Sequence, residues 1–203
     1  MGYSLEPLLD DCYPETAVLI NKFDIREEGK LNEVESVLTS AKSAEWSIAP
    51  KAETFDFAHY KAVHRFLFSD LYDWAGETRT VNISKKGARF CPAEEIGRQA
   101  ELIFERLREH DLYKGLPHGE FVDEIVDFYC ATNYLHPFRE GNGRAQRAFL
   151  SQLIRSAGYE ISFAGMDAEM LMIATIQAAQ GVQDLLRRVL RDNIKQADRI
   201  TNG

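Results

Sequence analysis

The chain has 203 residues, of which 45% are apolar and 11% aromatic, so it is long enough to bury one sizeable core as a single globular domain. Thirty-two acidic residues outnumber 24 basic residues and give a net charge of −8. This balance argues against a basic surface that binds nucleic acid by neutralising its phosphates, and we expect no direct nucleic-acid binding.

The first 20 residues contain neither a basic segment nor a long apolar run. We therefore expect no signal peptide and no membrane span. The three cysteines, Cys12, Cys91 and Cys130, leave an odd number and show no Cys-x-x-Cys spacing. Such a set fits a reducing compartment better than a disulfide framework. The expected location is the cytoplasm.

Two helices are expected in the first third of the chain. An irregular segment over 13–25 precedes a short amphipathic helix, marked by the spacing of Leu31, Val34, Val37 and Leu38. A longer helix follows, with Thr54 or Asp56 as its N-cap. His59 and His64 lie five residues apart in this helix without an evident third ligand. We interpret both as surface or satisfied core histidines rather than as metal ligands.

Residues 76–91 form the one convincing β segment. Residues 80–84 alternate between apolar and polar, 85–87 have turn character, and 88–90 return. A two-stranded hairpin is marginal alone and leaves an edge to which another extended chain can add. A hairpin that its own domain packs shut is the alternative.

Helices dominate the rest of the chain. Pro92 opens one that runs to His110, and a second carries residues 121–129 and ends before Pro137. A third ends near Gly158, and two more follow: one capped by Asp167, and one carrying residues 185–194. The predicted fold class is therefore mainly α, with one small β-hairpin.

The stretch over 136–147 reads His-Pro-Phe-Arg-Glu-Gly-Asn-Gly-Arg-Ala-Gln-Arg. Pro137 disfavours helical conformation in the residue before it, so His136 should lie at a helix exit. Gly141 and Gly143 bracket a turn that leads into the next helix, where backbone N–H groups can converge on one anion. This arrangement predicts a nucleotide-phosphate site.

The charged residues of this stretch sharpen the prediction. Arg144 and Arg147 share one face of the first helical turn, where a cation opposes the helix dipole by roughly 0.3–1 kcal/mol. A bound anion would reverse that sign. Glu140 is the candidate ligand of Mg²⁺, which reaches nucleotide sites through one or two carboxylates plus substrate phosphates. His136, with an ordinary pKa near 6.5, is the candidate general base.

These residues match every fixed position of the signature of the Fic family (filamentation induced by cyclic AMP), His-Pro-Phe-x-Asp/Glu-Gly-Asn-Gly-Arg-x-x-Arg. The resemblance extends to residues 71–79 and to their spacing from Phe90, and it covers roughly 13–190, with a core over 54–190. It implies a helical Fic-type domain with a flap hairpin over the active site. It also implies transfer of AMP from ATP to a hydroxyl side chain of a target protein.

The resemblance implies a role for each residue of the motif. Glu140 would hold Mg²⁺ between the α- and β-phosphates of ATP, and His136 would take the proton of the attacking hydroxyl. Phe138 would anchor the loop, and Asn142 would add a side-chain contact to the nucleotide. The phosphates would lie on Gly141, Asn142, Gly143, Arg144 and Arg147. The flap residues expected to hold the target are Val81, Asn82, Ile83, Ser84, Lys85 and Lys86.

Three other activities stay open. Related domains that act as kinases resemble this motif but carry a lysine at the position of Gly143, so Gly143 favours AMP transfer. Others use a different nucleotide donor, such as a phosphocholine carrier, and the sequence does not reveal the base pocket that decides this. A binding module with an inactive site would be expected to lose His136, Glu140 or an arginine, and all are present.

A last expectation concerns control of the activity. The family commonly carries an inhibitory helix with the pattern Ser/Thr-x-x-x-Glu-Gly/Asn, whose glutamate pairs with the second motif arginine. This chain shows no such pattern, because Ile161 follows the nearest approach, Ser156 to Glu160. We therefore expect a separate antitoxin-like protein that places a carboxylate on Arg147. The same resemblance suggests the ATPase subunits of type II topoisomerases as targets.

Overall fold

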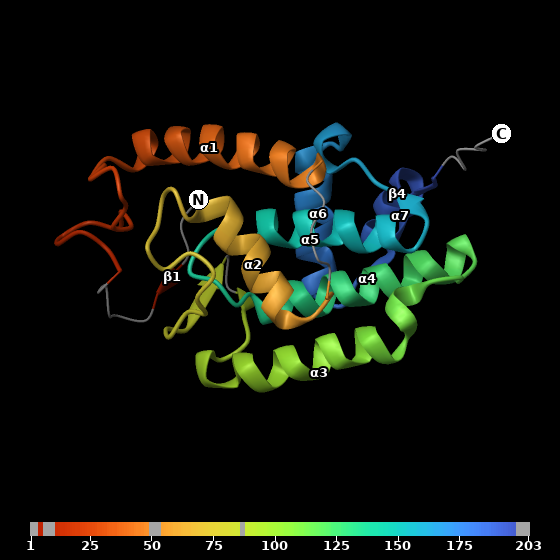
Figure 1. Cartoon of the computed structure of the whole chain (residues 1–203). Coiled ribbons are helices and arrows are strands. Elements are labelled where there is room, and N and C mark those ends of the chain that lie inside the picture. Colours follow the sequence, from red (N-terminus) through yellow and green to blue (C-terminus); the bar gives the residue numbers. More distant parts are fainter. Residues whose placement is uncertain (1–3, 6–10, 49–53, 86–87, 198–203) are drawn as a thin grey trace.

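The structure, a computed structural model, describes residues 4–5, 11–48, 54–85 and 88–197. It confirms the predicted fold class, mainly α with a small hairpin (Figure 1). No helix within these ranges is both long and apolar enough to cross a membrane. The α-helices are α1 (Glu28–Ile48), α2 (Phe57–Phe68), α3 (Ile96–Glu109), α4 (His118–Leu135), α5 (Asn142–Ser156), α6 (Ala168–Ala179) and α7 (Asp184–Asn193).

Two small antiparallel sheets accompany the helices. The first has the strand order β1-β2-β3, formed by Ser4–Leu5, Ile83–Lys85 and Ala88–Arg89. The second pairs β4 (Tyr159–Glu160) with β5 (Lys195–Gln196). The predicted hairpin therefore exists, with strands shorter than the segment over 76–91. We expected the hairpin to leave an open edge, but the β2 edge is closed, because β1 pairs with it.

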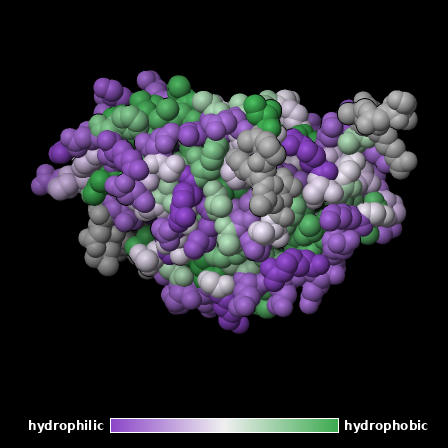
Figure 2. All heavy atoms as spheres, viewed as in Figure 1, coloured by the Kyte–Doolittle hydropathy of each residue, from purple (hydrophilic) through white to green (hydrophobic). Residues whose placement is uncertain are grey.

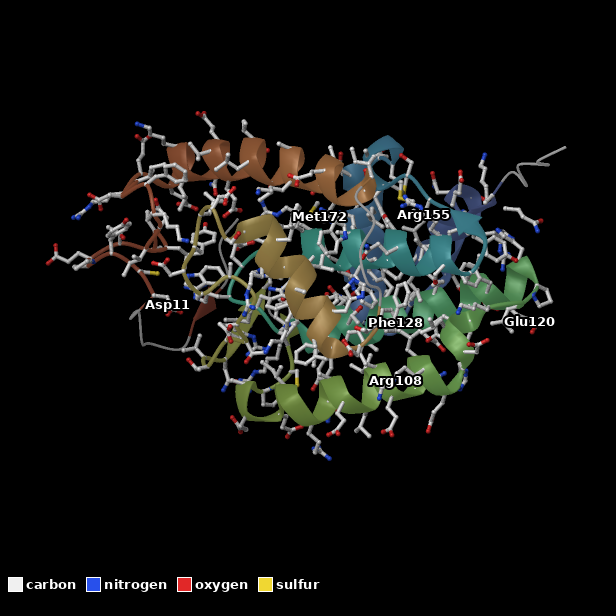
Figure 3. All side chains as sticks on the ribbon, viewed as in Figure 1. Asp11, Arg108, Glu120, Phe128, Arg155 and Met172 are labelled. Carbon is white, nitrogen blue, oxygen red and sulfur yellow. The ribbon has the colours of Figure 1, made fainter. Side chains whose placement is uncertain are left out.

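Helices α4 and α5 cross the middle of the molecule, between α1 at the top of Figure 1 and α3 at the bottom. α5 packs on α1, α2 and α4, and α4 also packs on α3, α6 and α7. Phe149 of α5 is fully buried, and Phe128 of α4, labelled in Figure 3, stacks on it with ring centroids 5.8 Å apart. Burial of such a ring contributes about 1.5–3 kcal/mol. Hydrophilic residues predominate along the lower edge, over α3 (Figure 2).

Local signals explain where the helices around the site begin and end. Asp56 caps α2, because its carboxylate accepts a hydrogen bond from the N–H of His59 at 2.7 Å. α4 ends at His136, which adopts φ +41° ahead of Pro137. α5 begins after Gly141 at φ +78°. The predicted helix exit and the predicted turn are both confirmed.

Helix α1 differs from the short helix that its apolar spacing predicts. It has 21 residues, and its buried face includes Glu35, Thr39 and Trp46. The two polar residues interrupt the apolar pattern although they face the interior. For this reason a search for apolar periodicity alone underestimates the length of α1.

Candidate active site

The loop between α4 and α5 brings the residues of the motif together. At Gly141 the left-handed conformation disfavours any side chain, and a Cβ atom there would lie 2.2 Å from the ring of Phe68. A Cβ atom on Gly143 would lie 3.3 Å from the guanidinium of Arg147. One glycine therefore fixes the path of the loop, and the other leaves room beside an arginine.

Phe138 and Asn142 hold the loop closed. Phe138 is fully buried, and its ring stacks on Tyr60 with centroids 5.6 Å apart. The Asn142 side chain accepts a hydrogen bond from the Phe138 N–H at 2.9 Å and donates one to the Phe138 carbonyl at 2.8 Å. Asn142 thus shapes the loop through both polar atoms of its side chain, and its contact with a nucleotide stays a prediction.

His64 supports the loop from below. It is fully buried and stacks on Phe138 at 3.9 Å and on Trp74 at 6.0 Å between ring centroids. The Gly76 N–H donates to its Nδ1 at 2.9 Å, so the proton of the neutral ring is on Nε2, which donates to the Glu140 carbonyl at 2.9 Å. Burial lowers the pKa of His64 to about 4. The sequence predicts a core or surface histidine here but gives no sign of this support.

Arg79 ties the flap to the loop. It is buried, and its Nε donates to the carbonyl of His136 at 2.9 Å. Its two other nitrogens donate to the carbonyls of Val81 at 2.8 Å and Cys91 at 2.5 Å. The Arg79 N–H also donates to the Pro137 carbonyl at 2.9 Å. Sequence reasoning places Arg79 in a region of family resemblance without assigning it this function.

His136 lies against the flap with its ring oriented. Phe90 stacks on it with ring centroids 3.7 Å apart. Its Nδ1 lies 3.1 Å from the carbonyl oxygen of Asn133. Since a carbonyl only accepts, Nδ1 carries the proton and Nε2 is the basic nitrogen. Burial lowers the pKa of His136 to about 3, so the ring is neutral and can accept a proton only where added negative charge stabilises the cation.

Glu140 has the geometry of a single-carboxylate cation ligand. One oxygen, Oε1, accepts from the Gly141 N–H at 2.8 Å and lies 3.6 Å from the Arg144 guanidinium. The other oxygen has no hydrogen-bond partner among the described residues. No group of three or more metal-binding side chains occurs within the same ranges. The site therefore fits a Mg²⁺ ion that takes its remaining ligands from phosphates and water.

The two motif arginines have different surroundings. Arg144 pairs with Glu35 of α1 and lies over the Phe68 ring at 4.8 Å. Arg147 pairs with no carboxylate in the described part of the chain, and burial lowers its pKa. Nearby, the backbone N–H groups of Asn142 and Gly143 find no acceptor among the described residues. A half-buried cation and two unsatisfied helix N–H groups together form a site for an anion.

A pocket of about 170 Å³ lies between the flap, α4 and α6. It adjoins His136, because Phe90 and Asn133 both line it and both contact the histidine ring. Opposite the flap, the hydroxyls of Tyr129 and Thr175 bond at 2.8 Å. The pocket is smaller than complete small-molecule sites, which suits one part of a nucleotide. Its lining is Arg89, Phe90, Tyr129, Cys130, Asn133, Tyr134, Thr175, Ala178 and Ala179.

The predicted flap residues divide into two groups. The carbonyl of Val81 accepts from Arg79, the side chain of Asn82 accepts from the Ala93 N–H at 2.9 Å, and Ile83 is 4% exposed. These three therefore fasten the flap to its own domain. Ser84 and Lys85 are half-buried and can still meet a partner. Lys86 lies outside the described residues.

The segment before α1 contacts the loop at Arg139, the position after His-Pro-Phe where the family signature allows any residue. Arg139 is 7% exposed, and its Nε donates to the carboxylate of Asp11 at 3.1 Å. Asp11 is labelled in Figure 3, on the segment that precedes α1. The same guanidinium lies 3.6 Å from the sulfur of Cys12. The N-terminal segment thus packs against the motif, an arrangement that the sequence does not predict.

Comparison with known proteins identifies the family. The Fic/DOC family matches residues 54–154. A probable protein adenylyltransferase, Fic, of Salmonella typhimurium is 34% identical over 97% of this chain and 96% of its own length. The protein adenylyltransferase VbhT of Bartonella schoenbuchensis is 36% identical over 90% of this chain, which spans 38% of the length of VbhT.

A solved structure supports the same assignment. The BepC protein of Bartonella tribocorum, a VirB-translocated effector with bound AMPPNP, superposes with a TM-score of 0.88 at 28% identity. The match covers 93% of this chain and 97% of that one. The family signature, the helical fold and the near full-length relatives agree, and the chain belongs to the Fic/DOC family.

Proposed function

We propose that this chain is a protein adenylyltransferase that transfers AMP from ATP to a hydroxyl side chain of a target protein. Relatives that it covers over nearly their full length are named for this activity, and a solved relative holds AMPPNP. The observation that carries the proposal is Arg147, a half-buried cation without a carboxylate partner among the described residues, beside the N–H groups of Asn142 and Gly143.

The nucleotide phosphates would lie on this anion site. Asn142 and Gly143 supply backbone N–H groups, and Arg147 supplies the charge that a leaving pyrophosphate needs. Glu140 would hold Mg²⁺ with its second oxygen. When bound, the ion would offset negative charge on the phosphates.

The base of the nucleotide would occupy the pocket beside His136. Phe90, Tyr129 and Tyr134 give it aromatic walls, and aromatic faces stack on nucleotide bases. A base held there would leave its phosphates close to the α5 N-terminus. This arrangement supports ATP as the donor without excluding another nucleotide that carries the same base.

His136 would act as the general base. Its Nε2 takes the proton of the target hydroxyl while the hydroxyl oxygen bonds to the α-phosphorus. The bond from that phosphorus to the bridging oxygen of the β-phosphate breaks, and pyrophosphate leaves. The Asn133 carbonyl and the Phe90 ring hold the imidazole in orientation, so catalysis rests on positioning and electrostatics.

Labelled ATP tests the proposal. With a cell lysate, label in the α-phosphate should enter protein and label in the γ-phosphate should not, since only AMP is transferred. The His136→Ala variant should lose roughly 10²–10⁴-fold in rate while it retains ADP affinity. His110→Ala, at an exposed histidine of the α3 C-cap, is the matched control. Transfer of the γ-label would instead identify a kinase.

We also propose that a separate antitoxin-like protein controls the enzyme. Arg147 has no carboxylate partner in the described part of the chain, and the printed sequence has no inhibitory pattern. A glutamate from a partner helix would pair with Arg147 and compete with the phosphates. The proposed targets are cytoplasmic proteins, among which the ATPase subunits of type II topoisomerases come from family resemblance alone.

Co-expression tests this control. Expression of the chain alone should arrest growth, His136→Ala should remove the arrest, and the protein encoded beside it should relieve it. Purified neighbour should also lower ADP affinity of the wild type but not of Arg147→Gln. Harmless expression of an active enzyme, or a neighbour that neither binds nor inhibits, would rule out the antitoxin.

A further inference from the structure

Glu35 of α1 lies outside the motif yet contacts it directly. Its side chain is 9% exposed, and Oε1 accepts a hydrogen bond from a terminal nitrogen of Arg144. The second oxygen, Oε2, accepts from the hydroxyl of Tyr72. Burial, and then the carboxylate itself, raises the pKa of Tyr72, so the phenol stays protonated and donates. Glu35 is thus a buried carboxylate whose two oxygens are both engaged.

Arg144 is held from several sides. Thr39, one turn after Glu35, accepts from its other terminal nitrogen at 3.2 Å, and the Phe68 ring lies below it. The nitrogen that bonds Glu35 lies 3.6 Å from Oε1 of Glu140. One guanidinium therefore stands between two carboxylates: one on α1, and one that is the candidate ligand of Mg²⁺.

We propose that Glu35 is a positioning residue: it neutralises Arg144, and so keeps that arginine from capturing Glu140 or the nucleotide. Arg147 is then the cation that meets the phosphates, and the second oxygen of Glu140 stays available to a divalent ion. The inference rests on the proposed function and assigns different tasks to Arg144 and Arg147, which the sequence analysis both places on the phosphates.

The sign of the effect separates positioning from a merely structural role. In Glu35→Gln the neutral amide no longer balances Arg144, which gains attraction for phosphate and for Glu140. ADP affinity without Mg²⁺ should then rise, and the gain in ADP affinity on adding Mg²⁺ should fall, each by roughly fivefold or more. A variant that only loosens α1 would weaken ADP binding in both conditions.

Calorimetric titration of ADP into the full chain, with and without MgCl₂, measures both quantities. Glu33→Gln, at an exposed glutamate of the same helix, should match the wild type. In an Arg144→Gln background, Glu35→Gln should have no further effect, since it acts through Arg144. Thr39→Val removes one acceptor for Arg144 and leaves the Glu35 carboxylate in place. Like Glu35→Gln, it should raise ADP affinity without Mg²⁺ and lower the gain in ADP affinity on adding Mg²⁺.

The outcomes distinguish this inference from the function on which it rests. A wild-type chain that binds no ADP would remove the proposed function itself. Suppose instead that the wild type binds ADP, but that Glu35→Gln and Thr39→Val leave ADP affinity unchanged, or weaken it equally, with and without Mg²⁺. That result would overturn only the role of Glu35.

Discussion

Arg79 and His136 are joined by a hydrogen bond of 2.9 Å, from the Nε of the arginine to the carbonyl oxygen of the histidine. The same side chain binds the carbonyls of Val81 and Cys91 at either end of the flap. The buried Arg79 thus positions His136, the proposed general base, and also holds the two ends of the flap that covers it. Flap and loop should therefore behave as one mechanical unit.

Arg79→Met should destabilise the protein strongly, because three carbonyls lose a charged donor. Hydrogen bonds to charged groups contribute about 1.5–3 kcal/mol each, so we expect a loss of roughly 3 kcal/mol or more in the free energy of unfolding. Urea unfolding measures it. Arg98→Met, which removes an exposed pair with Glu95, should cost less than about 1 kcal/mol. Equal losses in the two variants would contradict this account.

Acidification should destabilise the fold through His64. Its pKa is about 4 in the folded state against 6.5 ordinarily, so as pH falls below 6.5 the unfolded chain takes up the proton first. The contribution of neutral His64 to the free energy of unfolding is therefore fully present above pH 6.5. It falls by about 3 kcal/mol as the pH decreases from 6.5 to 4. His136, with a folded-state pKa of about 3, adds a loss in the same direction.

Two substitutions of His64 separate its hydrogen bonds from its titration. Asparagine can accept from the Gly76 N–H, and glutamine can donate to the Glu140 carbonyl. Both variants should be less stable than the wild type at pH 7.5 and should lose less stability between pH 6.5 and 4. Urea unfolding across that range checks this, and a slope identical to that of the wild type would exclude His64 as the titrating group.

Nucleotide binding should raise the pKa of His136. Burial alone favours the neutral ring, whereas phosphates placed beside it favour the cation. NMR titration of the ring carbon-bound protons, with and without ADP and MgCl₂, measures the change. His110, exposed at the end of α3, serves as the internal control that should not move. A pKa that stays the same or falls on binding would argue against His136 as the base.

Gly141 should tolerate no side chain. Gly141 and Gly158 both have positive φ, +78° and +85°. A Cβ atom added to Gly141 would lie 2.2 Å from the Phe68 ring, whereas one added to Gly158 would have no neighbour within 4 Å. Gly158→Ala should cost about 1 kcal/mol of stability from backbone strain alone. Gly141→Ala should cost more and weaken ADP binding, by calorimetry. Equal stability losses would show that Phe68 can move aside.

Proline substitutions in the flap should locate the edge that meets the target. The Phe90 N–H donates to the Ile83 carbonyl, so by strand alternation the Ser84 N–H faces β1 and the Arg89 N–H faces outward. Arg89→Pro should lower target labelling by up to roughly tenfold, as for one lost hydrogen bond. Because Arg89 also lines the pocket proposed for the nucleotide base, labelling is measured at saturating ATP. Ser84→Pro should have the smaller effect. The reverse order would mean that the target takes the place of β1.

The sequence predicts what lies close together along the chain. Pro137, Gly141 and the helix that follows determine the loop locally, so its shape and the fold class could be inferred. The supporting residues could not, because their partners are distant: His64 bonds a residue 76 positions away, Arg79 one 57 away, and Glu35 one 109 away. Glu35 and Thr39 also look like solvent-facing residues because they are polar, although they lie on the same helical face as the buried Leu31.

The stack of rings beneath the loop gives the protein an intrinsic optical reporter. Trp74 lies 4.4 Å from Tyr72 and 6.0 Å from His64 between ring centroids, and Tyr72 bonds the carboxylate that holds Arg144. The chain has two tryptophans, so replacing Trp46 by phenylalanine leaves Trp74, beside the site, as the one tryptophan. Its emission would then follow nucleotide binding in real time, without an attached dye.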